Sequence, residues 1–248
     1  MRTSLLLFAL LSFATTAVAQ TEPDWTYQGS TGTLNWGKLS PAYRACAKGH
    51  QQSPVDLGSA RLDTALKPLE FHFLAGPATV INTGRAIVVT VQPGSSILAN
   101  GVRYNLVSIE FHHPSEHTYR GNYTNMEADM LLRGADGQTA MLAIRLAEGQ
   151  DFPNATISML WQHLPQNPGQ SEKVTDMVNP GGLLPADRGY WTYMGSLLEP
   201  PCTEGVRWFV LQQPLGLSRN QIDSFVALYK MNTRRIHSLH GRKIQASE

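Results

Sequence analysis

The 248-residue sequence lacks any apolar run long enough to cross a bilayer. A membrane-spanning helix needs about 20 consecutive apolar residues; the run from Leu5 to Phe13 is too short, and no other stretch approaches that length. A glycine-rich phosphate loop, a nucleophile elbow and zinc-finger spacing are also missing. We therefore expect no membrane insertion and none of the functions that those motifs serve.

The short apolar run has the pattern of a leader. Arg2 precedes it, and Ala17-Val18-Ala19 supplies the small residues that a signal peptidase requires. We expect a signal peptide at 1–19, cleaved after Ala19, and a periplasmic or secreted protein. The remaining residues, 20–248, have the length of one β-rich domain and contain no internal repeat or linker.

An excess of charge of either sign is absent as well, with 20 Lys and Arg against 19 Asp and Glu. Removal of Arg2 with the leader leaves the two signs equal. Because nucleic acids and anionic lipids are bound largely through clusters of Lys and Arg, we expect no nucleic-acid partner. A small-molecule ligand or a protein partner stays open.

Cysteine is scarce. Only Cys46 and Cys202 occur, and in an oxidising compartment such a pair favours one disulfide. The alternative is two unrelated buried thiols.

Strand-like patterns dominate the chain. Segments rich in β-branched, aromatic or alternating apolar residues lie at 78–91, 102–113, 126–133, 139–146 and 206–212. Two helices are also expected. Ser218 and Gln221 form a capping-box pattern before one of them, and the other follows Thr156 and ends at Pro165. The fold class is mostly β with a few helices.

The strand at 102–113 carries polar residues on an otherwise apolar pattern. Alternation places Leu106, Ser108, Glu110 and His112 on one face and Val107, Ile109 and Phe111 on the other. A strand covered on both faces does not carry a carboxylate and an imidazole unless they are paired, metal-bound or lining a cavity. In 126–133, alternation puts Glu127 and Asp129 on one face, but the sequence alone does not pair the two strands.

The stretch IEFHHPSEH at 109–117 resembles the central motif of α-class carbonic anhydrases, which in bacterial members is roughly FHFHxPSEH. Further blocks match that family in the same order, at 35–37, 52–56, 82–84, 126–129, 190–193, 195–197, 200–201 and 232–234. The resemblance implies a large, mainly antiparallel central sheet with peripheral helices and a conical cleft. It also places Cys46 and Cys202 where extracellular members carry their disulfide.

The departures from the family pattern concern its active site. The three zinc histidines of the family correspond to Glu110, His112 and Asp129, so one histidine survives. Its catalytic threonine corresponds to Leu198, and the following threonine to Glu199.

Outside the ligand set, the resemblance assigns further positions. The proton-shuttle histidine of the family corresponds to Arg85. The family's glutamine that orients the first zinc histidine corresponds to Ser108. Glu116, Glu127 and Asn232 match supporting residues around the metal site.

These exchanges change the expected chemistry. Three neutral imidazoles leave zinc its full charge and so acidify its bound water, whereas two carboxylates cancel that charge. A Glu110, His112 and Asp129 set suits manganese or iron about as well as zinc, and no bound metal is the other possibility. Leu198 cannot orient a hydroxide, and Arg85 cannot relay protons near neutral pH.

Three hypotheses follow. The first is a binding or interaction protein with weak or absent CO2 hydratase activity. The second is a metal-dependent carbonic anhydrase or related hydrolase that uses Glu110, His112 and Asp129. The third is a metal-free acid/base enzyme that uses the carboxylates, which cannot all ionise in a low dielectric.

Overall fold

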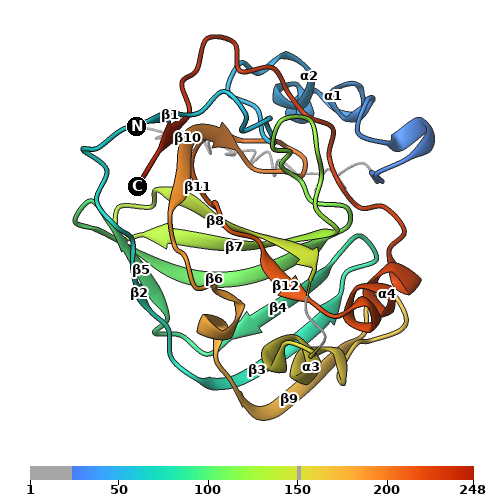
Figure 1. Cartoon of the computed structure of the whole chain (residues 1–248). Helices are drawn as coiled ribbons and strands as arrows, with labels where there is room; N and C mark the ends of the chain where they lie inside the picture. Colours follow the sequence, from blue (N-terminus) through green and yellow to red (C-terminus); the bar gives the residue numbers. More distant parts are fainter. Residues whose placement is uncertain (1–23, 150–151) are drawn as a thin grey trace, which may run out of the picture.

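A large sheet dominates the computed structural model, which describes residues 24–149 and 152–248 (Figure 1). In this described part the strand order is β1-β13-β10-β11-β8-β7-β6-β4-β3-β9, with β5 added to β6, β2 to β5 and β12 to β8. Most neighbours are antiparallel, while β8 pairs in parallel with β11 and β12, and β1 with β13. The predicted mostly β fold with a large, mainly antiparallel sheet is confirmed. The expected signal peptide lies outside the described residues.

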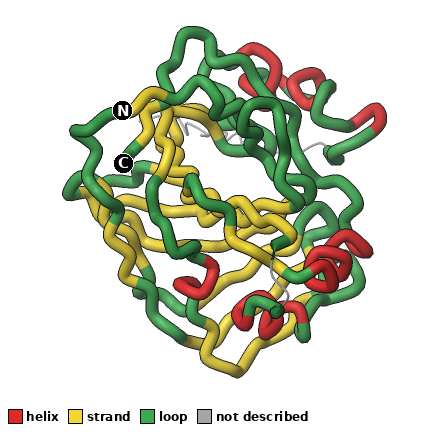
Figure 2. Tube along the Cα trace, viewed as in Figure 1, coloured by secondary structure: helices red, strands yellow, loops and turns green. Residues whose placement is uncertain are grey.

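The strands have the following bounds: β1 Arg61–Leu62, β2 Glu70–His72, β3 Gly76–Asn82, β4 Ile87–Val91, β5 Ser96–Ala99, β6 Val102–His112, β7 Met126–Gly134, β8 Thr139–Glu148, β9 Ser171–Val178, β10 Tyr190–Ser196, β11 Glu204–Leu211, β12 Leu215–Leu217 and β13 Gln245–Ala246. The α-helices are α1 Trp36–Leu39, α2 Ala45–Lys48, α3 Ala155–Trp161 and α4 Arg219–Leu228, and short 3-10 turns lie at Gly29–Thr31, Pro41–Tyr43 and Pro180–Leu183. Figure 2 shows the helices at the periphery of the sheet. None of the helices in the described part has the length and apolar character needed to cross a membrane.

The expected strand at 78–91 is two strands, β3 and β4, because residues 83–86 form the turn of a hairpin. Thr83 supports this turn, since its N–H and hydroxyl donate to the carbonyl oxygen of Ala86. The helix expected after Thr156 and up to Pro165 begins two residues earlier, at Ala155, and ends at Trp161. It is capped by Asn154, whose side chain accepts a hydrogen bond from the Ile157 N–H. Both corrections come from side chain to backbone bonds that hydrophobic periodicity does not report.

The capping box of α4 is present as predicted. The Ser218 hydroxyl accepts from the Gln221 N–H, and the Gln221 side chain accepts from the Ser218 N–H. We expect Ser218→Ala to lower the free energy of unfolding by about 1 kcal/mol. Ser224→Ala in the same helix is the matched control, because its hydroxyl bonds only the Asn220 carbonyl and lies on the exposed face. Urea unfolding of both variants measures the difference; an equal effect would contradict a capping role.

A β-bulge in β6 corrects the predicted alternation. The register with β7 shifts between Leu106 and Ser108, so Val107 is left exposed and Leu106 packs in the same apolar cluster as Ile109 and Phe111. Beyond the bulge the alternation holds. An extra residue in one strand reverses the faces on either side of it.

The sheet buries apolar residues on both faces. One face carries the larger cluster, which includes Phe111, Met130 and Leu142 and is covered by α3 and α4. The other carries a smaller cluster built around Trp208, Tyr193 and Leu198. Asp129 lies directly opposite Ala143 of this smaller cluster, so the polar residues of β6 and β7 belong to that face.

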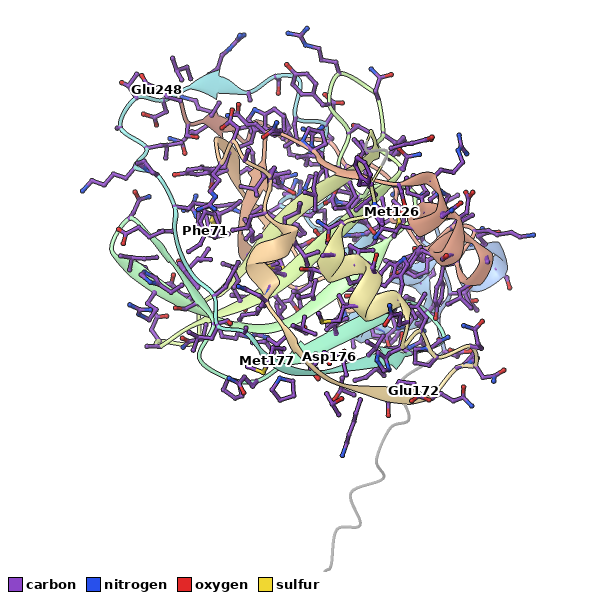
Figure 3. All side chains as sticks on the ribbon, turned by 60° about the horizontal axis from the view of Figure 1, so that its bottom comes forward. Phe71, Met126, Glu172, Asp176, Met177 and Glu248 are labelled. Carbon is purple, nitrogen blue, oxygen red and sulfur yellow. A yellow bond between two sulfur atoms is a disulfide. The ribbon has the colours of Figure 1, made fainter. Side chains whose placement is uncertain are left out.

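The outer strand β9 closes one edge of the sheet. Figure 3 shows Glu172, Asp176 and Met177 along it, and all three are exposed. Only Val174 and Val178 are buried in this strand. Charged side chains along an edge strand disfavour pairing with the edge of another molecule.

Candidate functional site

Strands β6 and β7 bring the three positions of the predicted ligand set together. Glu110 lies directly opposite Asp129, and His112 lies two residues further along β6, opposite Glu127. His112 and Asp129 are fully buried, whereas Glu110 is partly exposed. The sheet register thus supplies the strand pairing that the sequence left open.

His112 and Asp129 face each other across the two strands. Their Nε2 and Oδ2 atoms are 3.7 Å apart, which is too long for a hydrogen bond. His112 Nδ1 lies 2.8 Å from the Asn232 carbonyl oxygen. Since a carbonyl only accepts, Nδ1 carries the proton and Nε2 the lone pair of the neutral ring. Nε2 and both carboxylate oxygens of Asp129 lack hydrogen-bond partners among the described residues.

Glu110 lies beside the carboxyl group of Glu199. Burial raises the pKa of Glu110 to about 7 and that of Glu199 to about 8, and the charge of Glu110 adds to the rise at Glu199. The hydrogen bond between the two carboxyl groups favours the proton on Glu199. Glu199 also accepts a bond of 3.3 Å from the Tyr27 hydroxyl. This acid pair keeps part of its surface exposed.

Glu116 is buried behind His112. It accepts hydrogen bonds of 3.1 Å from the Arg234 main-chain N–H to both carboxylate oxygens, and His112 Nδ1 lies 3.2 Å from Oε1. Burial nevertheless raises the pKa of Glu116 well above its usual range, and the charges of Glu127 and Glu110 add to the rise. Burial also lowers the pKa of His112, which keeps its ring neutral.

Glu127 is held by His117 rather than by a residue of the predicted ligand set. Its Oε1 lies 2.6 Å from His117 Nδ1, and Oε2 accepts a bond of 3.0 Å from the His117 N–H. Although burial itself raises the pKa of Glu127, the contacts with His117 hold it below its usual value.

The pKa of Asp129 is shifted in the opposite direction from that of Glu127. Burial, followed by the charges of Glu127 and Glu116, raises the pKa of Asp129 well above its usual range. The nearby Glu127 carboxylate therefore favours the protonated form of Asp129. Glu110 with Glu199 and Asp129 with Glu127 are two neighbouring carboxyl pairs, and like charges so close in a buried site do not all ionise.

The donor set does not fit the three-ligand zinc centre that the family resemblance implies. Among the described residues, no group of three or more His, Cys, Asp and Glu side chains has the arrangement to hold a metal ion. His112 and Asp129 approach each other to 3.7 Å, and Glu110 lies beside a further acid, Glu199. A zinc site with three protein ligands needs all three donors directed at one point.

The other substituted positions play structural parts. Leu198 is buried and packs in the cluster around Trp208. Arg85 donates to Asp24 at 2.6 Å and to the Trp25 carbonyl at 2.9 Å, so it holds the chain that leads to Tyr27. The side chain of Ser108 forms no hydrogen bond with the described residues. None of these three side chains supplies a donor to His112 or Asp129.

Asn232 supports the site through both its main chain and its side chain. Its carbonyl fixes the His112 tautomer, and its side-chain nitrogen donates to the carbonyl oxygens of Phe111 and Arg85. Its side-chain oxygen accepts from the His113 N–H at 2.8 Å. Asn232 thus ties β6 to the segment after α4.

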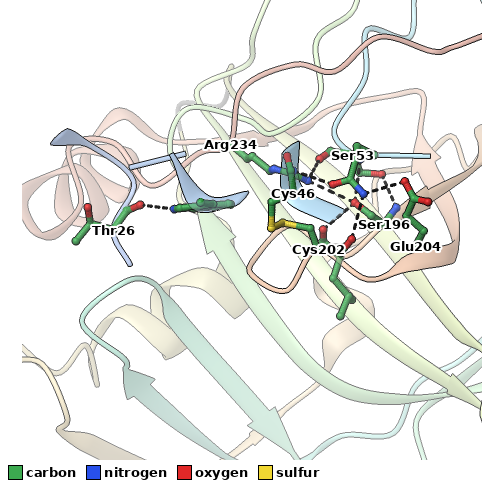
Figure 4. Close-up of a disulfide and its surroundings, with 10 residues drawn as sticks. Thr26, Cys46, Ser53, Ser196, Cys202, Glu204 and Arg234 are labelled. Carbon is green, nitrogen blue, oxygen red and sulfur yellow. Dashed lines mark hydrogen bonds between the residues drawn. A yellow bond between two sulfur atoms is a disulfide. The ribbon is translucent and has the colours of Figure 1, made fainter. Parts of the chain in front are cut away.

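The predicted disulfide between Cys46 and Cys202 is confirmed, and Figure 4 shows it next to Arg234. Around it the Arg234 guanidinium, which is 1% exposed, donates to the carbonyl oxygens of Ser53 at 2.7 Å and Cys46 at 3.1 Å. Cys202 in turn donates its N–H to the Glu199 carbonyl at 2.7 Å. The disulfide therefore anchors the loop that carries Leu198 and Glu199.

Sequence reasoning missed Tyr27, Arg234 and Tyr193 as parts of this network. Tyr27 reaches Glu199 from a segment 172 positions away, and the Tyr193 hydroxyl lies 2.7 Å from His117 Nε2. All three are large side chains buried to at least nine-tenths. A buried hydroxyl or guanidinium needs partners, but the sequence does not say which.

Comparisons with known proteins agree with this fold. The family model for eukaryotic-type carbonic anhydrase matches residues 31–248. A carbonic anhydrase of Klebsiella pneumoniae is 34% identical over 247 residues, covering 98% of this chain and 99% of its own. A hyperthermostable carbonic anhydrase from a hydrothermal vent chimney superposes with a TM-score of 0.86 at 35% identity, covering 91% of this chain and all of its own. Dioscorin complexed with ascorbate gives 0.83 at 28% identity, with coverage of 90% and 97%.

The large sheet has the fold of a carbonic anhydrase. The chain belongs to the eukaryotic-type, or α-class, carbonic anhydrase family.

Proposed function

We propose that this family member is not a rapid CO2 hydratase and acts as an exported binding or interaction protein. The observation that carries the proposal is the donor set around His112 and Asp129: among the described residues, no group of three or more His, Cys, Asp and Glu side chains is arranged to hold a metal ion. The buried Leu198 supports it, because an alkyl side chain cannot orient a nucleophile. The disulfide supports the exported location.

A binding role has a precedent within the fold. The structure of dioscorin complexed with ascorbate holds a small organic molecule, and that chain is 28% identical to this one. In this chain, the exposed parts of Glu110 and Glu199 offer carboxyl oxygens to such a ligand.

The test is elemental analysis and stopped-flow CO2 hydration on protein purified without chelator. We expect less than stoichiometric zinc and a hydration rate at least about a hundredfold below that of the Klebsiella relative measured beside it, because both metal binding and nucleophile orientation are impaired. Stoichiometric zinc with a comparable rate would overturn the proposal. Stoichiometric manganese or iron would favour the metal-dependent enzyme instead.

A further inference from the structure

A pocket lies away from the acid site, on the opposite face of the sheet. Its volume is about 580 Å³, within the range of small-molecule sites, and it is lined from β5, β6, β8, β10, β11 and β13. Phe209 and Thr192, which pair across β10 and β11, line it. Their strand neighbours Trp208 and Tyr193 belong instead to the cluster on the acid-site face. Alternation along both strands therefore separates the two sites.

Arg207 supplies the charge of this pocket. It is the one charged residue in the lining, and its guanidinium forms no hydrogen bond or ion pair with the described residues. It is nevertheless partly buried, opposite Met194 on β10. A partly desolvated cation without a counter-ion is unfavourable for the free protein. An anionic ligand would remove this penalty.

Thr192 adds an unused polar group to the same lining. Its side chain is 3% exposed, and its hydroxyl has no hydrogen-bond partner among the described residues. The hydroxyl oxygen itself is inaccessible from the pocket, so of these two residues Arg207 alone supplies a polar recognition group that a ligand can reach.

The remaining wall is largely apolar and aromatic. The Tyr104 and Phe209 rings lie edge to face with centroids 6.3 Å apart, and Leu66, Met194 and Val102 also line the pocket. The Tyr104 hydroxyl is already bonded to Gln138. The wall thus suits a ring or a short aliphatic body rather than a second charged group.

We propose that this pocket binds a small organic carboxylate, with the carboxylate on Arg207 and an apolar body against Phe209 and Tyr104. The planar guanidinium can bind both oxygens of a carboxylate, which distinguishes the ligand from a neutral amide of the same shape. A cationic ligand is disfavoured because no acidic side chain lines the pocket. The site is separate from the acid site of the proposed function.

Benzoate, benzamide and benzylamine are the probes, measured by ligand-detected NMR or calorimetry on the mature protein. We expect saturable benzoate binding with a Kd on the order of 1 mM, as usual for so small a ligand, and at least about tenfold weaker binding of the other two. Arg207→Met is expected to weaken benzoate binding at least about tenfold. Arg207→Lys is expected to weaken it less, because lysine keeps the charge but loses the paired hydrogen bonds.

Two further variants separate this site from other causes. Arg219→Met removes an exposed arginine of α4 that pairs with Glu148, and it is expected to leave benzoate affinity unchanged. Glu110→Gln/Glu199→Gln alters the acid site and is also expected to leave the benzoate affinity unchanged. The test of this pocket is therefore independent of the test of the proposed function. Benzoate affinity equal in wild type and Arg207→Met, or no saturable binding at about 20 mM, would overturn the proposal.

Discussion

The triple variant Glu110→His/Asp129→His/Leu198→Thr is expected to bind zinc stoichiometrically and to hydrate CO2 at least about a hundredfold faster than the wild type. Three neutral imidazoles leave the ion its full charge and therefore a more acidic bound water. The threonine hydroxyl restores a group that can orient a nucleophile. Elemental analysis and stopped-flow hydration measure the two effects.

The geometry for this gain is already in place. Positions 110 and 129 lie directly opposite each other on β6 and β7, and His112 shares their face. His112 donates through Nδ1 to the Asn232 carbonyl, so its Nε2 lone pair is free to bind an ion. Glu127, which lies beside position 129, offers a carboxylate to the introduced imidazole, and such outer partners strengthen metal binding.

The double variant Glu110→His/Asp129→His is the matched control. It is expected to bind zinc but to gain little activity, because Leu198 still lines the site without a hydroxyl. A folded triple variant that takes up no zinc would show that the remaining acids, Glu199 first among them, prevent the site from forming. Equal activity of the double and triple variants would show that Leu198 is not limiting.

The fold was largely predictable, and so was the placement of Glu110, His112 and Asp129 near one another, because β6 and β7 alternate regularly beyond the bulge. Glu110 and His112 share a face after the bulge, and Asp129 alternates with residues of the core on β7. A carboxylate on a strand that is covered on both faces requires a partner, and this requirement can be inferred from the sequence of that strand alone. The resemblance in the ordered sequence blocks then supplied the pairing of the two strands.

The partners themselves were not predictable, because they come from segments distant in sequence. Glu199 reaches Glu110 from the loop before β11, and the Asn232 carbonyl reaches His112 from beyond α4. Arg85 was expected only as a failed proton relay, yet it fixes the segment before Tyr27 through Asp24 and Trp25. Such contacts depend on loop paths, and periodicity carries no information about them.

The disulfide prediction has the largest expected effect on stability. Replacing both cysteines, Cys46→Ala/Cys202→Ala, is expected to lower the free energy of unfolding by about 4–5 kcal/mol, because the bond closes a loop with a sequence separation of 156. For a chain of this size that loss corresponds to a fall of about 2 M in the urea midpoint. The wild type unfolded in a reducing buffer is expected to match the variant, and an unchanged midpoint in both would contradict the prediction.

The Cys46→Ala/Cys202→Ala variant also tests whether the disulfide holds the loop that carries Glu199. Cys202 bonds the Glu199 carbonyl, and Cys46 lies in a buried cluster with Tyr27 and Trp36. Without the disulfide, the two segments that hold the Glu199 carboxyl stay joined by weaker contacts, namely the Tyr27 bond to Glu199, the bond from the Gln52 side chain to the Cys202 carbonyl and the Arg234 hydrogen bonds. Amide hydrogen exchange is therefore expected to rise first in residues 197–203 and in α2, while β6 and β7 stay protected. Uniform loss of protection across the sheet would show that the disulfide stabilises the whole fold and not the loop that carries Glu199.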